Sequence, residues 1–205
     1  VERGGAGVRS HSFSKSRVAA IALAFLVSAC VDTSNAPAEL RPELERMDAR
    51  DAAMSAEGKA TYRALYSNGA KLSAFLSNTT VRHFDALHGT QVEYLGSDGK
   101  TALWYPGNAV PVFGLWKVKQ TLDGPDMCFL YGQNTYNPVT DETSGRWECG
   151  DASLYLIGAA EVVNGDAFGL MQGRVPFRLS KENTTLKALA GRAGSKKLSP
   201  NKVNW

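Results

Sequence analysis

The chain has 205 residues, of which 43% are hydrophobic and 21% are charged. This is the composition of a globular protein, and it excludes a fully disordered or a collagen-like chain. Four of the 23 Lys and Arg residues and one of the 20 Asp and Glu residues precede residue 30, so the formal net charge of +3 arises there. The balanced remainder argues against a nucleic-acid partner.

The first 29 residues have the pattern of a secretory signal peptide. Four basic residues precede an uncharged apolar run at residues 18–27, and two small residues follow this run. That order is typical of a cleaved export signal. The run is too short to span a bilayer, which requires about 20 apolar residues. We therefore expect residues 1–29 to be absent from the mature protein.

The end of this leader resembles the lipobox of bacterial lipoproteins, with a branched residue and two small residues before a cysteine: Val27, Ser28, Ala29 and Cys30. The resemblance implies that Cys30 carries a diacylglyceryl group and that its new amine receives a further acyl chain, such as palmitate. Two or three acyl chains anchor a protein stably, whereas one chain is marginal. The alternative is an ordinary secretory signal that ends near a cysteine.

The resemblance also implies a location. We expect an envelope protein that faces the periplasm and is held to a membrane by its lipid. Val31 rather than an aspartate follows Cys30, which favours the outer over the inner membrane in enteric-type sorting.

Residues 30–41 are small, polar and proline-containing, and they indicate a lipidated tether. Helix-forming residues then dominate from Pro42 onward. Asn68 and Gly69 are a helix-stop signal, and a further short helix is expected at residues 70–76. We expect these helices to cover a sheet.

The following region contains short apolar or alternating runs that predict strands, at residues 79–84, 91–95, 101–105, 112–119, 126–131, 145–149, 154–157 and 173–179. Asp98-Gly99 and Asn164-Gly165 are signals for tight hairpins. The sequence therefore predicts a single α+β domain at residues 42–180. In it, N-terminal helices cover an antiparallel, curled β-sheet or half-barrel of about eight short strands.

Two cysteines remain after Cys30. In an exported protein the pair Cys128 and Cys149 is expected to form a disulfide. Closing a loop of about 20 residues contributes roughly 3 kcal/mol in the chain-entropy model. A two-ligand metal site and two free thiols are the alternatives.

Several strand motifs also resemble a family of small secreted proteobacterial proteins with a domain of unknown function. They lie within residues 76–150 and read LSNTTV, VEYLGSDGKTALWY, GLWKVK, MCFLYG and RWECG. The resemblance implies a β-rich fold and no particular activity.

The best candidate for chemistry is a cluster of polar residues at the end of the first strand. His83 and Asp85 share one strand face because side chains alternate, and His88 follows closely. Two imidazoles and a carboxylate can hold zinc, and an open position can activate water. The alternative is a strand end with polar tips. Nucleophile-elbow, zinc-protease, phosphate-loop and dinucleotide-binding motifs are absent from the sequence, and we expect no cofactor.

The last 25 residues, 181–205, are basic. Six Lys and Arg residues stand against one acid, Glu182. Leu186 and Leu189 allow a short helix from Thr184, but glycines and a proline oppose a long one. The segment buries too little apolar surface to offset about 1–2 kcal/mol of backbone entropy per residue. We expect a mobile tail, either solubilising or in contact with anionic lipid or an acidic partner.

Three functions remain open from the sequence. The aromatic residues of the strands fill a core or line an apolar pocket. We favour a non-enzymatic binding or assembly module, tethered at Cys30, which acts on an envelope protein partner not yet known. The alternatives are a carrier of lipid or another small molecule, and a metal-assisted hydrolase that uses His83, Asp85 and His88.

Overall fold

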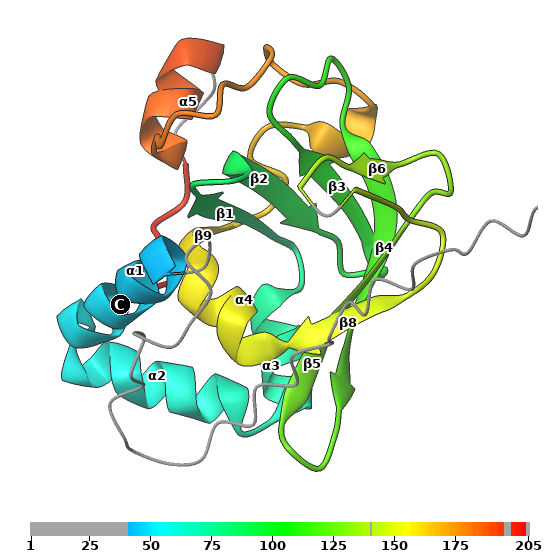
Figure 1. Cartoon of the computed structure of the whole chain (residues 1–205). Coiled ribbons are helices and arrows are strands. Elements are labelled where there is room, and N and C mark those ends of the chain that lie inside the picture. The colour runs from blue at the N-terminus through cyan, green and yellow to red at the C-terminus, as the bar shows by residue number, and fades with distance from the viewer. Residues whose placement is uncertain (1–40, 140, 195–197, 204–205) are drawn as a thin grey trace, which may run out of the picture. The chain divides into compact units, whose positions relative to one another are not determined.

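A computed structural model describes residues 41–139, 141–194 and 198–203 (Figure 1). The expected signal peptide, Cys30 and residues 31–40 of the expected tether lie outside these described residues. No helix in the described part of the chain is long and apolar enough to cross a membrane.

The described chain is an α+β fold built on a curled antiparallel sheet (Figure 1). Seven strands form this sheet: β1 (Thr79–Asp85), β2 (Gly89–Leu95), β3 (Lys100–Trp104), β4 (Val112–Gln120), β5 (Pro125–Tyr131), β8 (Glu148–Asp151) and β9 (Ala159–Asn164). Their order is β8-β5-β4-β3-β2-β1-β9. A small hairpin of β6 (Tyr136–Asn137) and β7 (Glu142–Thr143) rises from the β5–β8 connection.

Five α-helices are described: α1 (Arg41–Ala53), α2 (Ala56–Tyr66), α3 (Gly69–Leu76), α4 (Ala152–Gly158) and α5 (Leu186–Ala193). A 3₁₀ turn, η2, spans Leu170–Gln172. The side chain of Asn68 accepts a hydrogen bond from the Lys71 amide and caps the start of α3. The Asn68-Gly69 pair therefore starts one helix as well as ending another.

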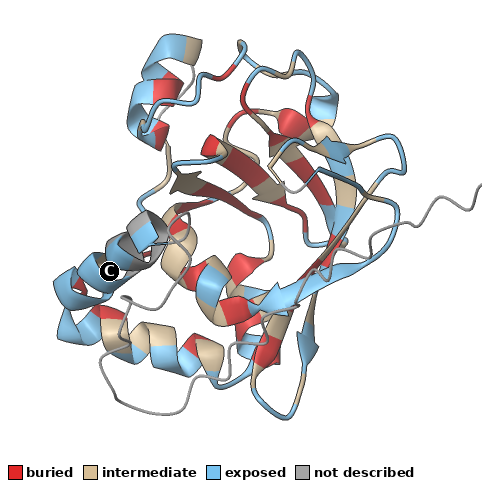
Figure 2. Cartoon of the chain, in the orientation of Figure 1, coloured by how far each residue is buried: buried red, intermediate tan, exposed pale blue. Residues whose placement is uncertain are grey.

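Strand alternation gives the sheet two different faces. Face A carries Val81, Leu95 and Trp116, which pack against Leu72 and other residues of the helices. Face B carries the alternate positions and packs against η2, α5 and the segment between them. Its buried residues include Val92, Ala102 and Trp104. Figure 2 shows buried residues concentrated on the strands and on the inward sides of the helices.

The expected strand at residues 154–157 is instead part of helix α4. The side chain of Asp151 accepts a hydrogen bond from the Ser153 amide and caps this helix, so its apolar residues Leu154 to Ile157 wind rather than extend. The expected strand at 173–179 is irregular, because Gly169 and Gly173 both have a positive φ and turn the chain. The helices are also not all N-terminal, since α4 and α5 follow most of the sheet.

The expectation of a mobile tail from residue 181 is wrong for the described residues 181–194 and 198–203. Leu186 is fully buried, Leu189 is 4% exposed and Val203 is 3% exposed. The Thr185 side chain caps α5, and the Lys202 amide donates to the carbonyl of Val162 on β9. The two leucines bury apolar surface and the cap satisfies a backbone amide. A count of charged and apolar residues does not reveal either effect.

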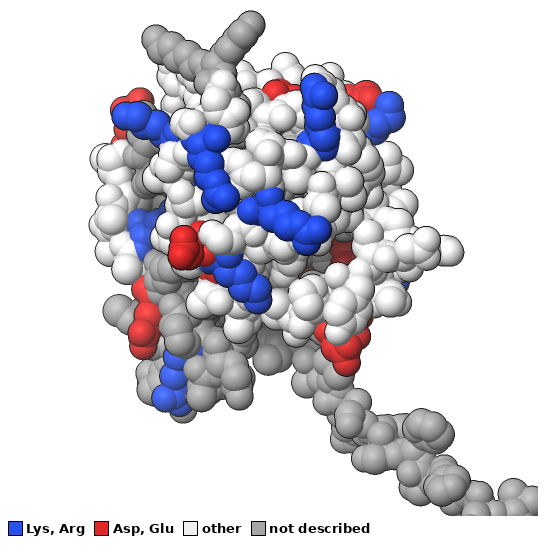
Figure 3. All heavy atoms as spheres, turned by 90° about the horizontal axis from the view of Figure 1, so that it is seen from above, with Lys and Arg blue, Asp and Glu red and all other residues white. Residues whose placement is uncertain are grey.

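Basic residues remain on the surface of the segment that covers face B. Figure 3, seen from above, shows Lys and Arg side chains gathered on this side of the molecule. The exposed basic residues of the segment are Arg174, Arg178, Lys181, Lys187 and Arg192.

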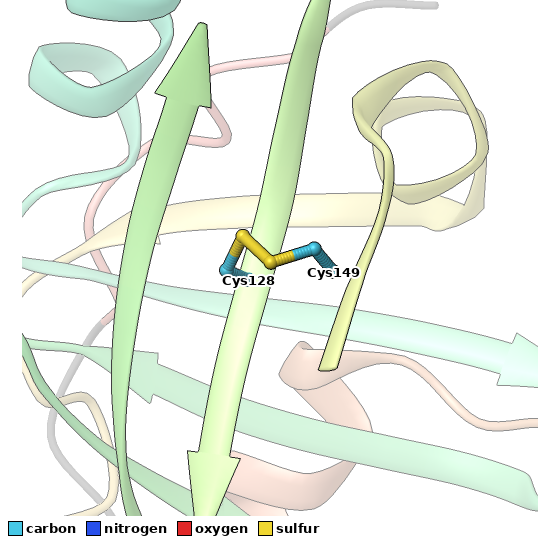
Figure 4. Close-up of a disulfide and its surroundings, with 2 residues drawn as sticks. All are labelled: Cys128 and Cys149. Carbon is cyan, nitrogen blue, oxygen red and sulfur yellow. A yellow bond between two sulfur atoms is a disulfide. The ribbon is translucent and has the colours of Figure 1, made fainter. Parts of the chain in front are cut away.

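Cys128 and Cys149 form a disulfide, as the sequence predicts (Figure 4). The two residues lie directly opposite each other on neighbouring strands β5 and β8, with their Cα atoms 4.0 Å apart. The bond ties the short edge strand β8 to the sheet and closes a loop that contains the β6–β7 hairpin.

Candidate functional site

A cleft of about 680 Å³ opens on face A, beside the part that the helices cover. Its floor comes from β1, β2, β3 and β5, and its walls from α4 and the β6–β7 hairpin. Strand pairing explains the floor: Val81 lies opposite Glu93, Glu93 lies opposite Leu103, and His83 lies opposite Gln91. Side chains at alternate positions of these strands therefore converge on one space.

Glu93 is a buried carboxylic acid at the floor of the cleft. The residue is 5% exposed. Its Oε1 accepts hydrogen bonds from the Tyr131 hydroxyl at 2.5 Å and from the Thr101 hydroxyl at 2.7 Å. Burial raises the pKa of Glu93 from 4.5 to about 7, although the two hydrogen bonds oppose this rise. Burial and the nearby Glu93 charge raise the pKa of Tyr131 well above its usual value.

His83 and Tyr155 bring two polar atoms without partners to the same cleft. The His83 Nε2 and the Tyr155 hydroxyl are buried and have no hydrogen-bond partner among the described residues. Their rings are in contact, with centroids 4.5 Å apart. Burial, followed by the charges of Arg50 and Arg82, lowers the pKa of His83 from 6.5 to about 3. The imidazole is therefore neutral at pH 7.

Aromatic rings connect these two parts of the cleft. Phe129 stacks on Tyr131 with centroids 6.1 Å apart, and it contacts Tyr155 with centroids 5.7 Å apart. Together with the His83 ring, they form a continuous aromatic wall from β5 across α4 to β1.

The charged side chains that line the cleft are all acidic. They are Asp85, Glu93, Glu142 and Glu148. Among the described residues that line the cleft there is no Lys or Arg. Arg146, outside the lining, lies 3.9 Å from Glu142, and the other carboxylates make the potential in the cleft negative.

The three residues predicted as a metal site all line this cleft, but their side chains have separate contacts. Asp85 accepts hydrogen bonds from the Leu87 and His88 amides and from the Gln91 side chain. The His88 Nδ1 lies 3.0 Å from the Tyr105 hydroxyl. No group of three His, Cys, Asp or Glu residues able to hold a metal ion occurs among the described residues. The zinc centre of the hydrolase hypothesis is therefore not assembled.

Sequence reasoning missed the residues with the most altered environments, Glu93 and Tyr155. A single acid on the inward face of the run VEYL is a signal for Glu93, since its neighbours Val92 and Leu95 are apolar. Tyr155 gave no such signal, because its segment was expected to be a strand.

Comparisons with protein-family models, with curated proteins and with solved structures found no significant match to this chain.

Proposed function

We propose that this protein is a non-enzymatic binding module that holds a small organic ligand in the cleft on face A. The observation that supports this most directly is a cleft of about 680 Å³ whose lining residues His83 and Tyr155 each hold a buried polar atom without a partner among the described residues. Clefts of roughly 300–1,000 Å³ with apolar walls and a few polar groups are typical of small-molecule sites.

The unpartnered atoms give the cleft a reason to be occupied. A buried polar group without a hydrogen bond costs about 1–3 kcal/mol. The His83 Nε2 and the Tyr155 hydroxyl both incur this cost, and a polar group of a ligand relieves it. Leu103, Val112 and Phe129 supply apolar surface for the rest of the ligand.

The cleft is tested with Nile red, a neutral dye whose emission rises in apolar surroundings. Val112 lines the cleft, whereas the next residue, Phe113, lies on the opposite face and is 45% exposed. We expect Val112→Trp to weaken dye binding at least about tenfold, because the added indole occupies part of the cleft and obstructs the dye.

Phe113→Trp is the matched control, and it should change dye affinity less than about twofold. Thermal unfolding of both variants checks that they are folded. Equal loss of affinity in the two variants, or no loss in either, contradicts a ligand site in the cleft.

We further propose that the module works in the cell envelope, anchored by a lipid on Cys30. The lipobox resemblance of residues 27–30 supports this. We expect Cys30→Ser to move the protein from the membrane fraction to the soluble envelope fraction, or to leave it as an unprocessed precursor. Immunoblotting of fractionated cells measures this.

Ser28→Gly is the control for the anchor, because it keeps a small residue in the lipobox and should leave the protein in the membrane fraction. Membrane association of the Cys30→Ser protein at its processed mass contradicts the anchor.

A further inference from the structure

We infer that the cleft selects a ligand with a primary ammonium group, which binds at the floor beside Glu93 and the rings of Phe129 and Tyr131. This inference rests on the proposed function, because it assigns the ligand chemistry of the same cleft.

The first argument is charge. Four carboxylates line the cleft, and none of its described lining residues is a Lys or Arg. The positive groups near the cleft have partners: behind His83, Arg50 donates to the Ala159 carbonyl and Arg82 pairs with Glu161. Arg146, which is not a lining residue, lies 3.9 Å from the Glu142 carboxylate. The Glu93 end of the cleft is thus its acidic end, which attracts a cation and repels an anion.

The second argument is hydrogen-bond direction. The Tyr131 hydroxyl uses its hydrogen toward Glu93, and the Thr101 hydroxyl uses its hydrogen toward Glu93 or the Tyr94 carbonyl. The oxygens left around the carboxylate can therefore only accept. A ligand at this floor must bring donors. An ammonium group has three donors and no acceptor, and it complements this set of groups. A carboxylate or phosphate group has acceptors only.

The third argument is the aromatic wall. Ring faces attract cations electrostatically within about 6 Å of the centroid, and the attraction is strongest where water is excluded. The ring planes of Phe129 and Tyr131 are parallel to within 3°. The Tyr131 hydroxyl donates to Glu93, so this pair of rings lies beside the acid. Diagonal neighbours on adjacent antiparallel strands lie roughly 7–8 Å apart, so the ligand can also reach His83 on β1.

The experiment titrates three probes of equal chain length into the folded protein at pH 7.5. They are n-hexylammonium, 1-hexanol and hexanoate, which carry a positive, a neutral and a negative head group. Backbone amide shifts in two-dimensional NMR spectra locate each probe and give its Kd. We expect hexylammonium to bind in the cleft at least about tenfold more tightly than hexanol, and hexanoate to bind most weakly.

Two variants connect the preference to the acid. In Glu93→Gln we expect the preference for hexylammonium over hexanol to fall below about threefold, whereas Glu57→Gln, at an exposed site on α2, keeps it. If Glu93→Gln does not fold, Glu148→Gln, at an exposed wall position, is expected to lower the preference about twofold.

The outcomes separate the two proposals. If hexanol or hexanoate binds in the cleft as tightly as hexylammonium, the ammonium inference is overturned while the binding function stands. If none of the three probes shifts cleft residues, the ammonium inference fails, and Nile red then decides separately whether the cleft binds any ligand.

An ammonium group occurs in free amines and in aminophospholipid headgroups. Cadaverine and dihexanoyl-phosphatidylethanolamine distinguish these sources. Because the lipid also carries an anionic phosphate, which the carboxylates repel, we expect cadaverine to bind at least about fivefold more tightly. Failure of both compounds to bind overturns the inference.

Discussion

Glu93→Gln should change how the stability of the fold depends on pH, and it should make the protein more stable at pH 8. The pKa of Glu93 is about 7 in the folded protein, against an ordinary value of 4.5. Between these values the folded state keeps a proton that the unfolded state has released. The stability that Glu93 contributes is therefore complete below pH 4.5 and is lost as the pH rises to 7, by about 3 kcal/mol.

His83 acts in the opposite direction. Its pKa is about 3 in the folded protein, against an ordinary value of 6.5. Between these values the unfolded state binds a proton that the folded state excludes. The stability that His83 contributes is therefore complete above pH 6.5 and is lost as the pH falls to 3, by roughly 5 kcal/mol. Between pH 4.5 and 6.5 the two residues largely cancel in the wild type.

The substitution at Glu93 removes one of these opposing effects. The free energy of unfolding should then rise from pH 3 to 6.5 and stay high at pH 8. There the variant should exceed the wild type by up to about 3 kcal/mol. At pH 4.5 it should have no advantage, because protonated Glu93 is neutral, as glutamine is. Urea unfolding at a series of pH values measures the free energy of unfolding of the wild type and of Glu93→Gln.

Glu57→Gln, on the exposed side of α2, controls for the loss of one negative charge and should follow the wild-type curve. A Glu93→Gln curve parallel to that of the wild type contradicts a buried acid with a raised pKa.

The loss of stability on ionisation of Glu93 has a consequence for ligand binding. A protein that retains an ionised carboxylate at pH 8 in a buried site loses stability there, and an ammonium ligand restores part of it. Bound ligand stabilises only the folded state, so hexylammonium should protect the wild type more than Glu93→Gln.

Local patterns in the sequence were sufficient for much of the sheet. Alternating side chains predict β2 and β3, and Asp98-Gly99 predicts the turn between them. The same alternation of side chains places His83 and Asp85 on one strand face, and both residues line the cleft. The disulfide was predicted from the even number of cysteines that follow the expected export signal.

The sequence could not reveal contacts made by distant segments. Residues 154–157 have strand-like composition, but the Asp151 cap and the packing of Leu156 in the core make them helical. Glu93 and Tyr155 are far apart in the chain, and only the fold brings both residues to the same cleft. Their unusual environments are properties of burial, which no local motif encodes.

The C-terminal segment is a further case in which contacts with distant residues could not be predicted. Its composition is basic, but a few buried side chains are sufficient to hold it against the fold. The Arg82 guanidinium pairs with Glu161, whose carboxylate also accepts the Leu186 amide at 3.0 Å. Arg82 also donates to the Asn183 side chain at 3.1 Å. These bonds seat the start of α5 against face B.

Leu186→Ala should therefore destabilise the whole domain by about 2–5 kcal/mol, the usual cost of truncating a buried leucine. The fully buried Leu186 side chain belongs to the same core as Trp104 and Phe168, so the cavity opens within the main fold. Lys187→Ala changes the next, exposed residue of α5 and should shift stability by less than about 0.5 kcal/mol. Urea unfolding, monitored by tryptophan fluorescence, compares the two variants. A mobile tail would give two equal and negligible effects, whereas a packed one gives a large loss for the leucine alone.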